Sequence, residues 1–218
     1  MPNSSLNKNR ILNCKNNKDV GYSLVKGEEI IIEYYEPEEP LKQSRLLIST
    51  VVHGYEDINN WHSQLKVNES GSCNLDVICS DGIPWSKEIR AVARITNGGG
   101  LCSGSLVNNT ANDGKPYFLT ANHCGTAHAG TVFRFRWESP NPSCATTTNS
   151  TNGPENMNIN GGVLRASNTN SDFALIELNT APNAAWNIYY NGWDRSDLES
   201  NIQNTFGIHH PAGDIKKI

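Results

Sequence analysis

Two residues that can exchange protons stand at the ends of apolar segments. The segment YFLTANHC, Tyr117–Cys124, carries His123 next to its final cysteine. The segment SDFALIEL, residues 171–178, has Asp172 as its second residue. A neutral imidazole can take a proton from a serine hydroxyl that attacks a carbonyl, while a carboxylate on the other ring nitrogen holds the tautomer. The pair therefore fits the base half of a serine hydrolase.

We expect strands to carry both residues, because abundant asparagine together with 18 glycines and 10 prolines indicates many turns and short strands. We expect an all-β fold with a long loop over residues 138–162. The expected strands cover Ile30–Tyr35, Leu46–His53, Ile89–Thr96, Leu101–Val107, Lys115–Thr120, Thr131–Trp137, Gly162–Ala166, Phe173–Leu178, Ala185–Trp193 and Thr205–His209.

Composition narrows the class of protein. The chain has 218 residues, 22 acidic and 18 basic side chains, and a formal net charge of −4. It has no apolar run near the roughly 18 residues that a membrane-spanning helix needs. It also lacks the Lys/Arg clusters that nucleic-acid binding requires. We therefore expect neither a membrane nor a nucleic-acid partner.

The six cysteines indicate disulfides, and hence an oxidising compartment outside the cell. None is spaced as Cys-x-x-Cys. His123 and His128 flank Cys124, but no second ligand pair follows at a suitable spacing, so we expect no metal and no cofactor. Residues 1–20 lack the apolar core of a signal peptide, so we expect that the export signal is missing from this sequence. The residues by themselves leave the cysteine pairing open.

The segments FLTANHC and SDFALIEL resemble the histidine and aspartate motifs of chymotrypsin-fold serine proteases. The segments SGSCNLDVIC, CSGSLVNNTANDGKPYFLTANHC, GWDRSD and IHHP resemble the bacterial lysyl endopeptidases, from about Ser70 to Ile218. The resemblance implies a chymotrypsin-like double β-barrel, with His123 as general base and Asp172 as its orienting partner. It also implies two disulfides, Cys102–Cys124 and Cys79–Cys144, and a partner far downstream for Cys73.

The same resemblance implies a division of the chain. Residues 1–66 would be a truncated, β-rich propeptide remnant with its linker. Residues 67–184 would form a complete first barrel, and residues 185–218 the start of a second. Processing after Lys66 would suit a lysine-specific protease, whose own propeptide would then be a partner. The loss of Cys73's partner would leave Cys14 and Cys73 outside the two bridges.

The nucleophile of such a protease is missing from the sequence. No Gly-x-Ser-Gly motif follows Asp172, and the groups Ser70–Ser72 and Ser103–Ser105 precede His123. We therefore expect a fragment of a secreted, monomeric serine endopeptidase that cleaves proteins or peptides, after lysine, and that is inactive as this fragment. The alternative is a non-catalytic, disulfide-stapled β domain, a degenerate protease or an adhesin, that binds peptide or glycan.

Overall fold

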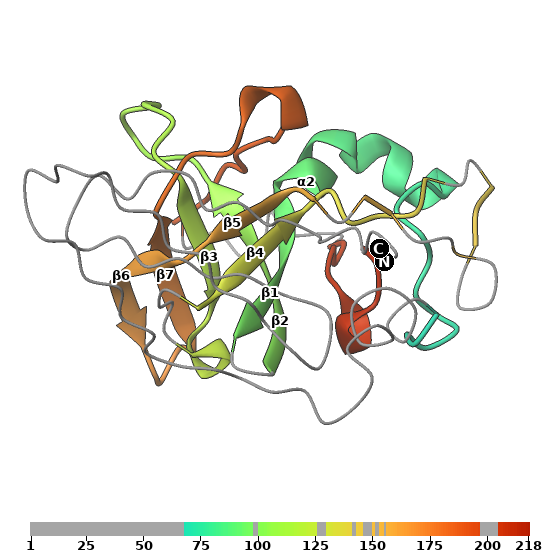
Figure 1. Cartoon of the computed structure of the whole chain (residues 1–218), viewed down its shortest axis with the longest axis horizontal. Helices are drawn as coiled ribbons and strands as arrows, with labels where there is room; N and C mark the ends of the chain where they lie inside the picture. Colours follow the sequence, from blue (N-terminus) through green and yellow to red (C-terminus); the bar gives the residue numbers. More distant parts are fainter. Residues whose placement is uncertain are drawn as a thin grey trace, which may run out of the picture.

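The structure, a computed structural model, describes residues 68–97, 100–125, 130–140, 143–145, 150, 153–154, 156–196 and 205–218. Figure 1 shows strands at the centre and short helices at the periphery. The elements in chain order are η1 (Ser80–Trp85), α2 (Ser86–Ala91), β1 (Val92–Asn97), β2 (Gly100–Val107), β3 (Tyr117–Ala121), η2 (Asn122–Cys124), β4 (Val132–Phe135), β5 (Asn158–Asn160), β6 (Gly162–Asn168), β7 (Phe173–Leu178), η3 (Ala184–Trp186) and η5 (Pro211–Gly213).

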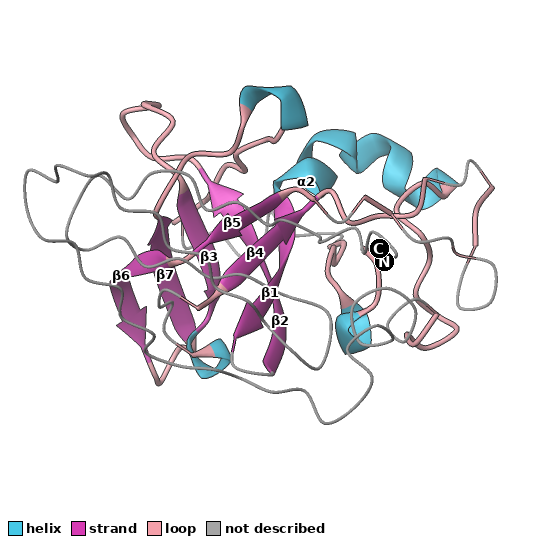
Figure 2. Ribbon diagram, in the orientation of Figure 1, coloured by secondary structure: helices cyan, strands magenta, loops and turns pink. Residues whose placement is uncertain are grey.

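Seven strands form one curled sheet in the order β5-β4-β1-β2-β3-β7-β6 (Figure 2). Every pairing between neighbours is antiparallel. The two edge strands, β5 and β6, are consecutive in the chain and separated by Gly161, whose φ of 70° is a conformation that glycine adopts easily. The sheet must therefore curl until its edges approach. The all-β, chymotrypsin-like barrel expected from the sequence is confirmed.

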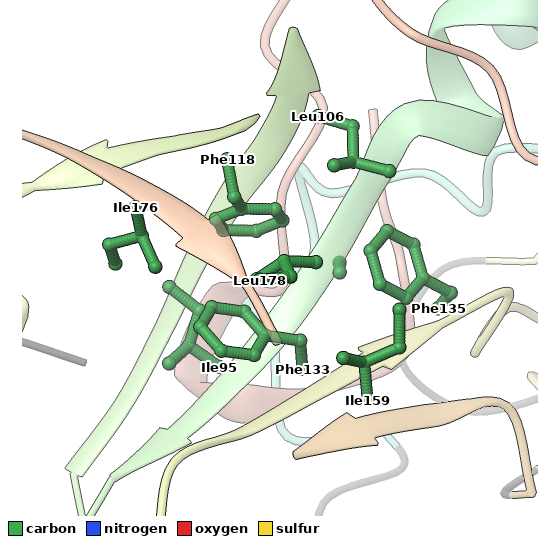
Figure 3. Packing of buried hydrophobic residues seen from close by; sticks show 9 residues of the cluster. Ile95, Leu106, Phe118, Phe133, Phe135, Ile159, Ile176 and Leu178 are labelled. Atoms are coloured by element: carbon green, nitrogen blue, oxygen red, sulfur yellow. The ribbon is translucent and has the colours of Figure 1, made fainter. Parts of the chain in front are cut away.

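Alternate positions of the strands fill the inside of the curl (Figure 3). The cluster consists of Ala93, Ile95, Leu106, Phe118, Phe133, Phe135, Ile159, Ile176 and Leu178. Phe118 meets Phe133 edge to face, with ring centroids 4.9 Å apart, an arrangement that aromatic quadrupoles favour. Gly104 of β2 makes room for this ring, because a Cβ at that position would lie 2.3 Å from a ring atom of Phe118.

The last described segment covers the outside of β1. Arg94 alternates with the core residues of β1, yet it is buried and donates to the carbonyl of Gly213. Its guanidinium carbon lies 4.0 Å from the ring centroid of Trp137, which also stacks on His210. The segment and Trp137 thus cover the outer face of β1, which explains why Arg94 is buried although it points away from the core.

The same segment returns to the start of the described chain. Asp76 and Lys217 form an antiparallel bridge, flanked by reciprocal backbone hydrogen bonds between Leu75 and Ile218. Lys217 forms a further bridge with His209. Residues 209–218 therefore lie between the beginning of the described chain and the barrel, as the red segment near the terminus in Figure 1 shows.

Several predicted strand boundaries were wrong. The predicted strand Ile89–Thr96 begins only at Val92, because residues 86–91 form α2. The predicted loop 138–162 contains the short strand β5. Its sequence Asn-Ile-Asn is mostly polar, and it is a strand because it pairs with β4. Both errors arise where a neighbouring element decides the local conformation, which propensity alone does not capture.

The strands predicted over Ala185–Trp193 and Thr205–His209 were also wrong. Within these ranges the structure has a short 3-10 helix, η3, and single bridges at Asn191 and His209. Alternating residues of the first range, Trp186, Ile188 and Tyr190, do pack against the core cluster. The alternation of apolar residues indicates which side chains pack against the core. Without a neighbouring strand to pair with, however, this segment does not form a strand.

Two disulfides connect segments outside the strands, one of them to β2 of the barrel. Cys79 is bonded to Cys144, and Cys102 to Cys124. Cys73 is exposed and outside both bridges. The predicted strands Ile30–Tyr35 and Leu46–His53, and the predicted propeptide remnant as a whole, lie outside the described residues.

Among the described residues, no helix is both long and apolar enough to cross a bilayer.

Candidate functional site

Neighbouring strands bring His123 and Asp172 together. β3 ends at Ala121, and the short helix η2 carries His123 directly after it. β7 begins at Phe173, which is in register with Ala121. Because the pairing is antiparallel, the residue before β7 lies beside the residues after β3. Two positions 49 residues apart in the chain are therefore adjacent in space.

Asp172 contacts His123 twice. The Oδ2 atom of Asp172 lies 2.6 Å from Nδ1 of the imidazole, and Oδ1 accepts the backbone N–H of His123 over 2.9 Å. Since the carboxylate accepts at Nδ1, the proton of a neutral ring sits on that nitrogen. Nε2 then carries the lone pair and is the atom that can act as a base.

The electrostatics favour an ionised aspartate. Hydrogen bonds from the His123 side chain, and then from its backbone, hold the pKa of the Asp172 carboxyl below 3.8, its ordinary value. The side chain of His123 is 70% exposed and that of Asp172 46%. The pair is accessible on the described surface, so a substrate or another part of a protein can reach the imidazole.

Backbone contacts hold this exposed pair in place. Asp172 has a φ of 51°, the left-handed region, and its carbonyl accepts the N–H of Asn122. The turn before it is capped by Asn168, whose Oδ1 accepts the N–H groups of Asn170 and Ser171. Sequence reasoning did not single out Asn168, although Asn is typical of such turns.

The Cys102–Cys124 disulfide ties the histidine loop to β2. The loop receives a second connection from Asn97 of β1, whose side-chain amide donates to the carbonyl of Cys124 over 3.4 Å. Gly125 follows with a φ of 84°, and its N–H donates to the backbone carbonyl of Asn122. His123 therefore sits on a short loop that is anchored at several points.

A metal does not fit at this position. Possible ligand atoms of Cys102, His123 and Cys124 lie within 4.8 Å of one another. The two sulfurs are bonded to each other, however, so neither is the thiolate that binds zinc. The remaining imidazole alone is not a metal site.

The hydroxyls of three early serines bond to residues other than His123. The hydroxyl of Ser70 donates to Asp214, that of Ser103 accepts the N–H of His210, and that of Ser105 bonds with Asn191 and Leu106. Their partners are therefore structural, and their positions give no support to a nucleophilic role.

The surroundings of Ser150 resemble those of a nucleophilic serine, because its hydroxyl lies within 2.9 Å of both the Asp76 carboxylate and the Lys217 ammonium. Asp76 and Lys217 have no exposed area, and Ser150 is 7% exposed. Because all three side chains are buried, we assign this group to the fold.

The curled all-β barrel has the architecture of the chymotrypsin-like class. It carries an accessible His–Asp pair, and a disulfide next to the histidine ties its loop to the barrel. Comparison with known proteins narrows this class. The family described as "Lysyl endopeptidase, C-terminal domain" matches residues 67–218, and the chain belongs to this family. The resemblance seen in the sequence is thereby confirmed.

One curated relative shows how the chain relates to a longer protein. The chain is similar to the lysyl endopeptidase of Pseudomonas aeruginosa, with 28% identity over 159 residues. The alignment covers 68% of this chain and 34% of that relative. The chain thus spans about a third of the length of that relative.

Proposed function

We propose that the chain supplies the base half of a serine endopeptidase. His123 acts as general base through Nε2, and Asp172 orients the imidazole and stabilises the imidazolium that forms. The observation that carries the proposal is the 2.6 Å contact between His123 Nδ1 and Asp172 Oδ2, made by a histidine that remains accessible. The nucleophilic serine and the oxyanion hole lie outside these 218 residues, and the chain alone does not hydrolyse peptides.

The chemistry follows from the orientation of the imidazole. As a serine oxygen attacks the carbonyl carbon of a peptide, Nε2 takes the hydroxyl proton. The ring becomes an imidazolium between two hydrogen bonds, and then donates the proton to the departing amine. Asp172 stays ionised throughout, which its lowered pKa supports.

The substrate, location and domain division are part of the same proposal. Membership of the lysyl endopeptidase family supports cleavage after lysine in proteins or peptides. Two disulfides support a secreted, oxidised protein. Residues 1–66 act as propeptide and linker, residues 67–184 as the first barrel, and residues 185–218 as the start of the second. The family match begins at residue 67, which supports processing after Lys66, and the proposal takes the mature enzyme as a monomer.

The test compares the 218-residue chain with the longest natural form of the protein. We expect an organophosphate to label the natural form on one serine outside residues 1–218, and to leave the shorter chain unlabelled. We also expect a lysyl ester to be hydrolysed by the natural form, and not by its His123→Ala variant. His209→Ala, at a partly buried histidine outside the pair, is the control that should retain activity.

Three outcomes would contradict the proposal. Turnover by the 218-residue chain that vanishes in His123→Ala would show that the nucleophile lies within it. An unlabelled, inactive natural form would favour a non-catalytic binding domain. Amino-terminal sequencing of the secreted protein should begin at Val67, and a start far from there would refute the processing site.

A further inference from the structure

The disulfide beside the candidate base joins two sulfurs that would bind a metal if they were free thiolates. Possible ligand atoms of Cys102, His123 and Cys124 lie within 4.8 Å of one another, and the described residues contain no second group of this kind. His123 is exposed, and both cysteines are partly exposed. In the oxidised protein the bridge keeps the sulfurs from binding a metal. Reduction therefore decides whether this group can take an ion.

The imidazole already has the orientation of a metal ligand. Asp172 Oδ2 lies 2.6 Å from Nδ1 of His123, so Nε2 carries the lone pair. Metal-binding histidines ordinarily donate their other ring N–H to a carboxylate, a carbonyl or water, which fixes the ring and raises the basicity of the ligating nitrogen. The contact that prepares His123 as a base therefore also prepares it as a metal ligand.

Contacts other than the disulfide hold the histidine loop beside β2. The Asn97 side-chain amide donates to the Cys124 carbonyl over 3.4 Å. The Asp172 carboxylate accepts the backbone N–H of His123 over 2.9 Å. Neither bond uses a sulfur atom, so we expect the loop to remain beside Cys102 when the bridge opens.

We propose that reduction of the Cys102–Cys124 bridge creates a zinc site made of two thiolates and the His123 imidazole. Zinc binds cysteine sulfur at about 2.3 Å and histidine nitrogen at about 2.0–2.1 Å, and three protein ligands leave a fourth position for water. The Cα atoms of the two cysteines are 6.1 Å apart, so both side chains can turn toward one ion while the backbone stays in place. The two thiolates also neutralise the charge of the ion.

Two steps connect the oxidised form to the metal-bound form. A reductant of the dithiol class transfers two electrons and two protons to the bridge, so that two thiols form and the reductant becomes a disulfide. The zinc ion then binds both sulfurs as thiolates and displaces their two protons. The oxidised protein therefore excludes the metal, and the reduced protein binds it.

The metal would occupy the nitrogen that the peptidase needs. A zinc ion on Nε2 of His123 prevents that atom from taking a proton from a serine hydroxyl. The reduced natural form should therefore lose hydrolysis of a lysyl ester when zinc is added. This consequence rests on the proposed function. The metal site does not rest on it, because all three protein ligands belong to the 218-residue chain.

The experiment uses cobalt(II) as the probe, because cobalt replaces zinc in such sites and absorbs visible light strongly when thiolates hold it tetrahedrally. The 218-residue chain carries Cys14→Ser and Cys73→Ser, which leave the four cysteines of the two bridges. A water-soluble phosphine reduces the bridges and takes oxygen from water to become a phosphine oxide, so no competing thiol is added. Cobalt is titrated first, and zinc is then added to displace it.

We expect the reduced chain to bind one cobalt ion with thiolate-to-metal absorption, and zinc to abolish that absorption. The oxidised chain should show neither effect. His123→Ala removes an exposed ligand and should weaken cobalt binding at least about tenfold, and Asp172→Asn should weaken it by about tenfold through the orienting contact. His209→Ala, at a histidine outside the group, is the matched control and should leave the binding unchanged.

Several results would overturn the proposal. They are the absence of a tetrahedral cobalt spectrum in the reduced chain, equal binding by the oxidised chain, and equal binding by His123→Ala. Absorption that persists when Cys102 and Cys124 are both replaced by serine would place the metal on the other pair of cysteines. Loss of the far-ultraviolet circular dichroism on reduction would also overturn it, because the site needs the anchored loop. None of these readouts requires peptidase activity, so a failure of the peptidase assays is distinguishable from a failure of the metal site.

Discussion

At the scale of single residues, the site consists of one carboxylate and one imidazole that position each other. The sequence predicted both residues, because each stands at the boundary of an apolar strand in a recognisable motif. It did not predict the second contact, from the His123 backbone to Asp172, which depends on the path of the loop. Every residue except proline has a backbone N–H, so the type of residue at position 123 does not predict this contact.

The titration of Asp172 tests how much of its environment comes from the imidazole. We expect His123→Ala to raise the pKa of the Asp172 carboxyl toward 3.8, because the largest cause of its lowered pKa is the bond from the histidine side chain. The return should be incomplete, since the backbone N–H of residue 123 remains. Carbon NMR of the carboxyl during an acid titration measures it, with Asp194 as an internal reference. An unchanged pKa would contradict this assignment.

Asn168 offers a second test, because it caps the turn that orients Asp172. Replacement by alanine leaves the N–H groups of Asn170 and Ser171 without this acceptor, at a cost of about 0.5–1.5 kcal/mol. We expect Asn168→Ala to raise the pKa of the Asp172 carboxyl and to lower the kcat of the natural enzyme more than it raises KM. Asn170→Ala in the same turn is the matched control, since Asn170 contributes its backbone N–H. Equal behaviour of the two variants would refute a positioning role.

At the scale of elements, the sheet depends on a few close approaches between strands. Alternation of apolar and polar residues predicted the positions of β2, β3 and β7 to within about two residues. It failed for β5 and for residues 185–193, because a strand exists only where a partner pairs with it. Gly104 shows another kind of constraint, which is set by the size of Phe118 on the adjacent strand β3.

Gly104→Ala should destabilise the barrel. The added Cβ would lie 2.3 Å from Phe118 and 2.6 Å from the Leu119 carbonyl, so strand or ring must shift. Overpacking of this kind costs about 1–3 kcal/mol. Urea unfolding of the 218-residue chain measures the change. Gly192→Ala, where a Cβ meets no atom within 4 Å, is the control. A loss of stability no larger than in the control would show that β2 has room to move.

At the scale of the whole molecule, residues 209–218 join the start of the described chain to the outer face of the barrel. No local pattern in the sequence predicts this contact. Adjacent lysines such as Lys216 and Lys217 are ordinarily solvated, yet both are fully buried. Lys216 reaches Glu138 and the Ile89 carbonyl, and Lys217 reaches Asp76. Such long-range partners cannot be inferred from local patterns.

This segment also makes the stability sensitive to acid. Burial, followed by the charges of Lys216 and Arg94, holds the pKa of His210 well below 6.5, and His209 contributes in the same direction. The unfolded chain therefore takes up a proton at His210 below about pH 6.5, whereas the folded chain does not. The free energy of unfolding should fall as the pH drops from 6.5 to 5, by up to about 1.4 kcal/mol per pH unit for one proton.

Chemical denaturation at several pH values measures this slope, in a range where most carboxylates stay ionised. We expect His210→Gln, which retains an N–H donor for the Asp214 carbonyl, to be less stable at pH 7 but flatter between pH 6.5 and 5. An equally steep curve for His209→Gln and the unaltered chain serves as the reference. A steep curve that persists in His210→Gln would assign the acid sensitivity to another group.

The burial of the two terminal lysines has a consequence for autolysis. An enzyme that cuts after lysine is surrounded by copies of itself, each carrying lysines of its own. Of the four lysines among the described residues, Lys216 and Lys217 are fully buried, Lys115 precedes a proline, and Lys87 lies in α2. A peptidase needs an extended, accessible segment, which Lys87, Lys216 and Lys217 do not offer without local unfolding, whereas Lys115 is exposed. The fold thus places three of the four described lysines where the proposed enzyme would be slow to digest itself.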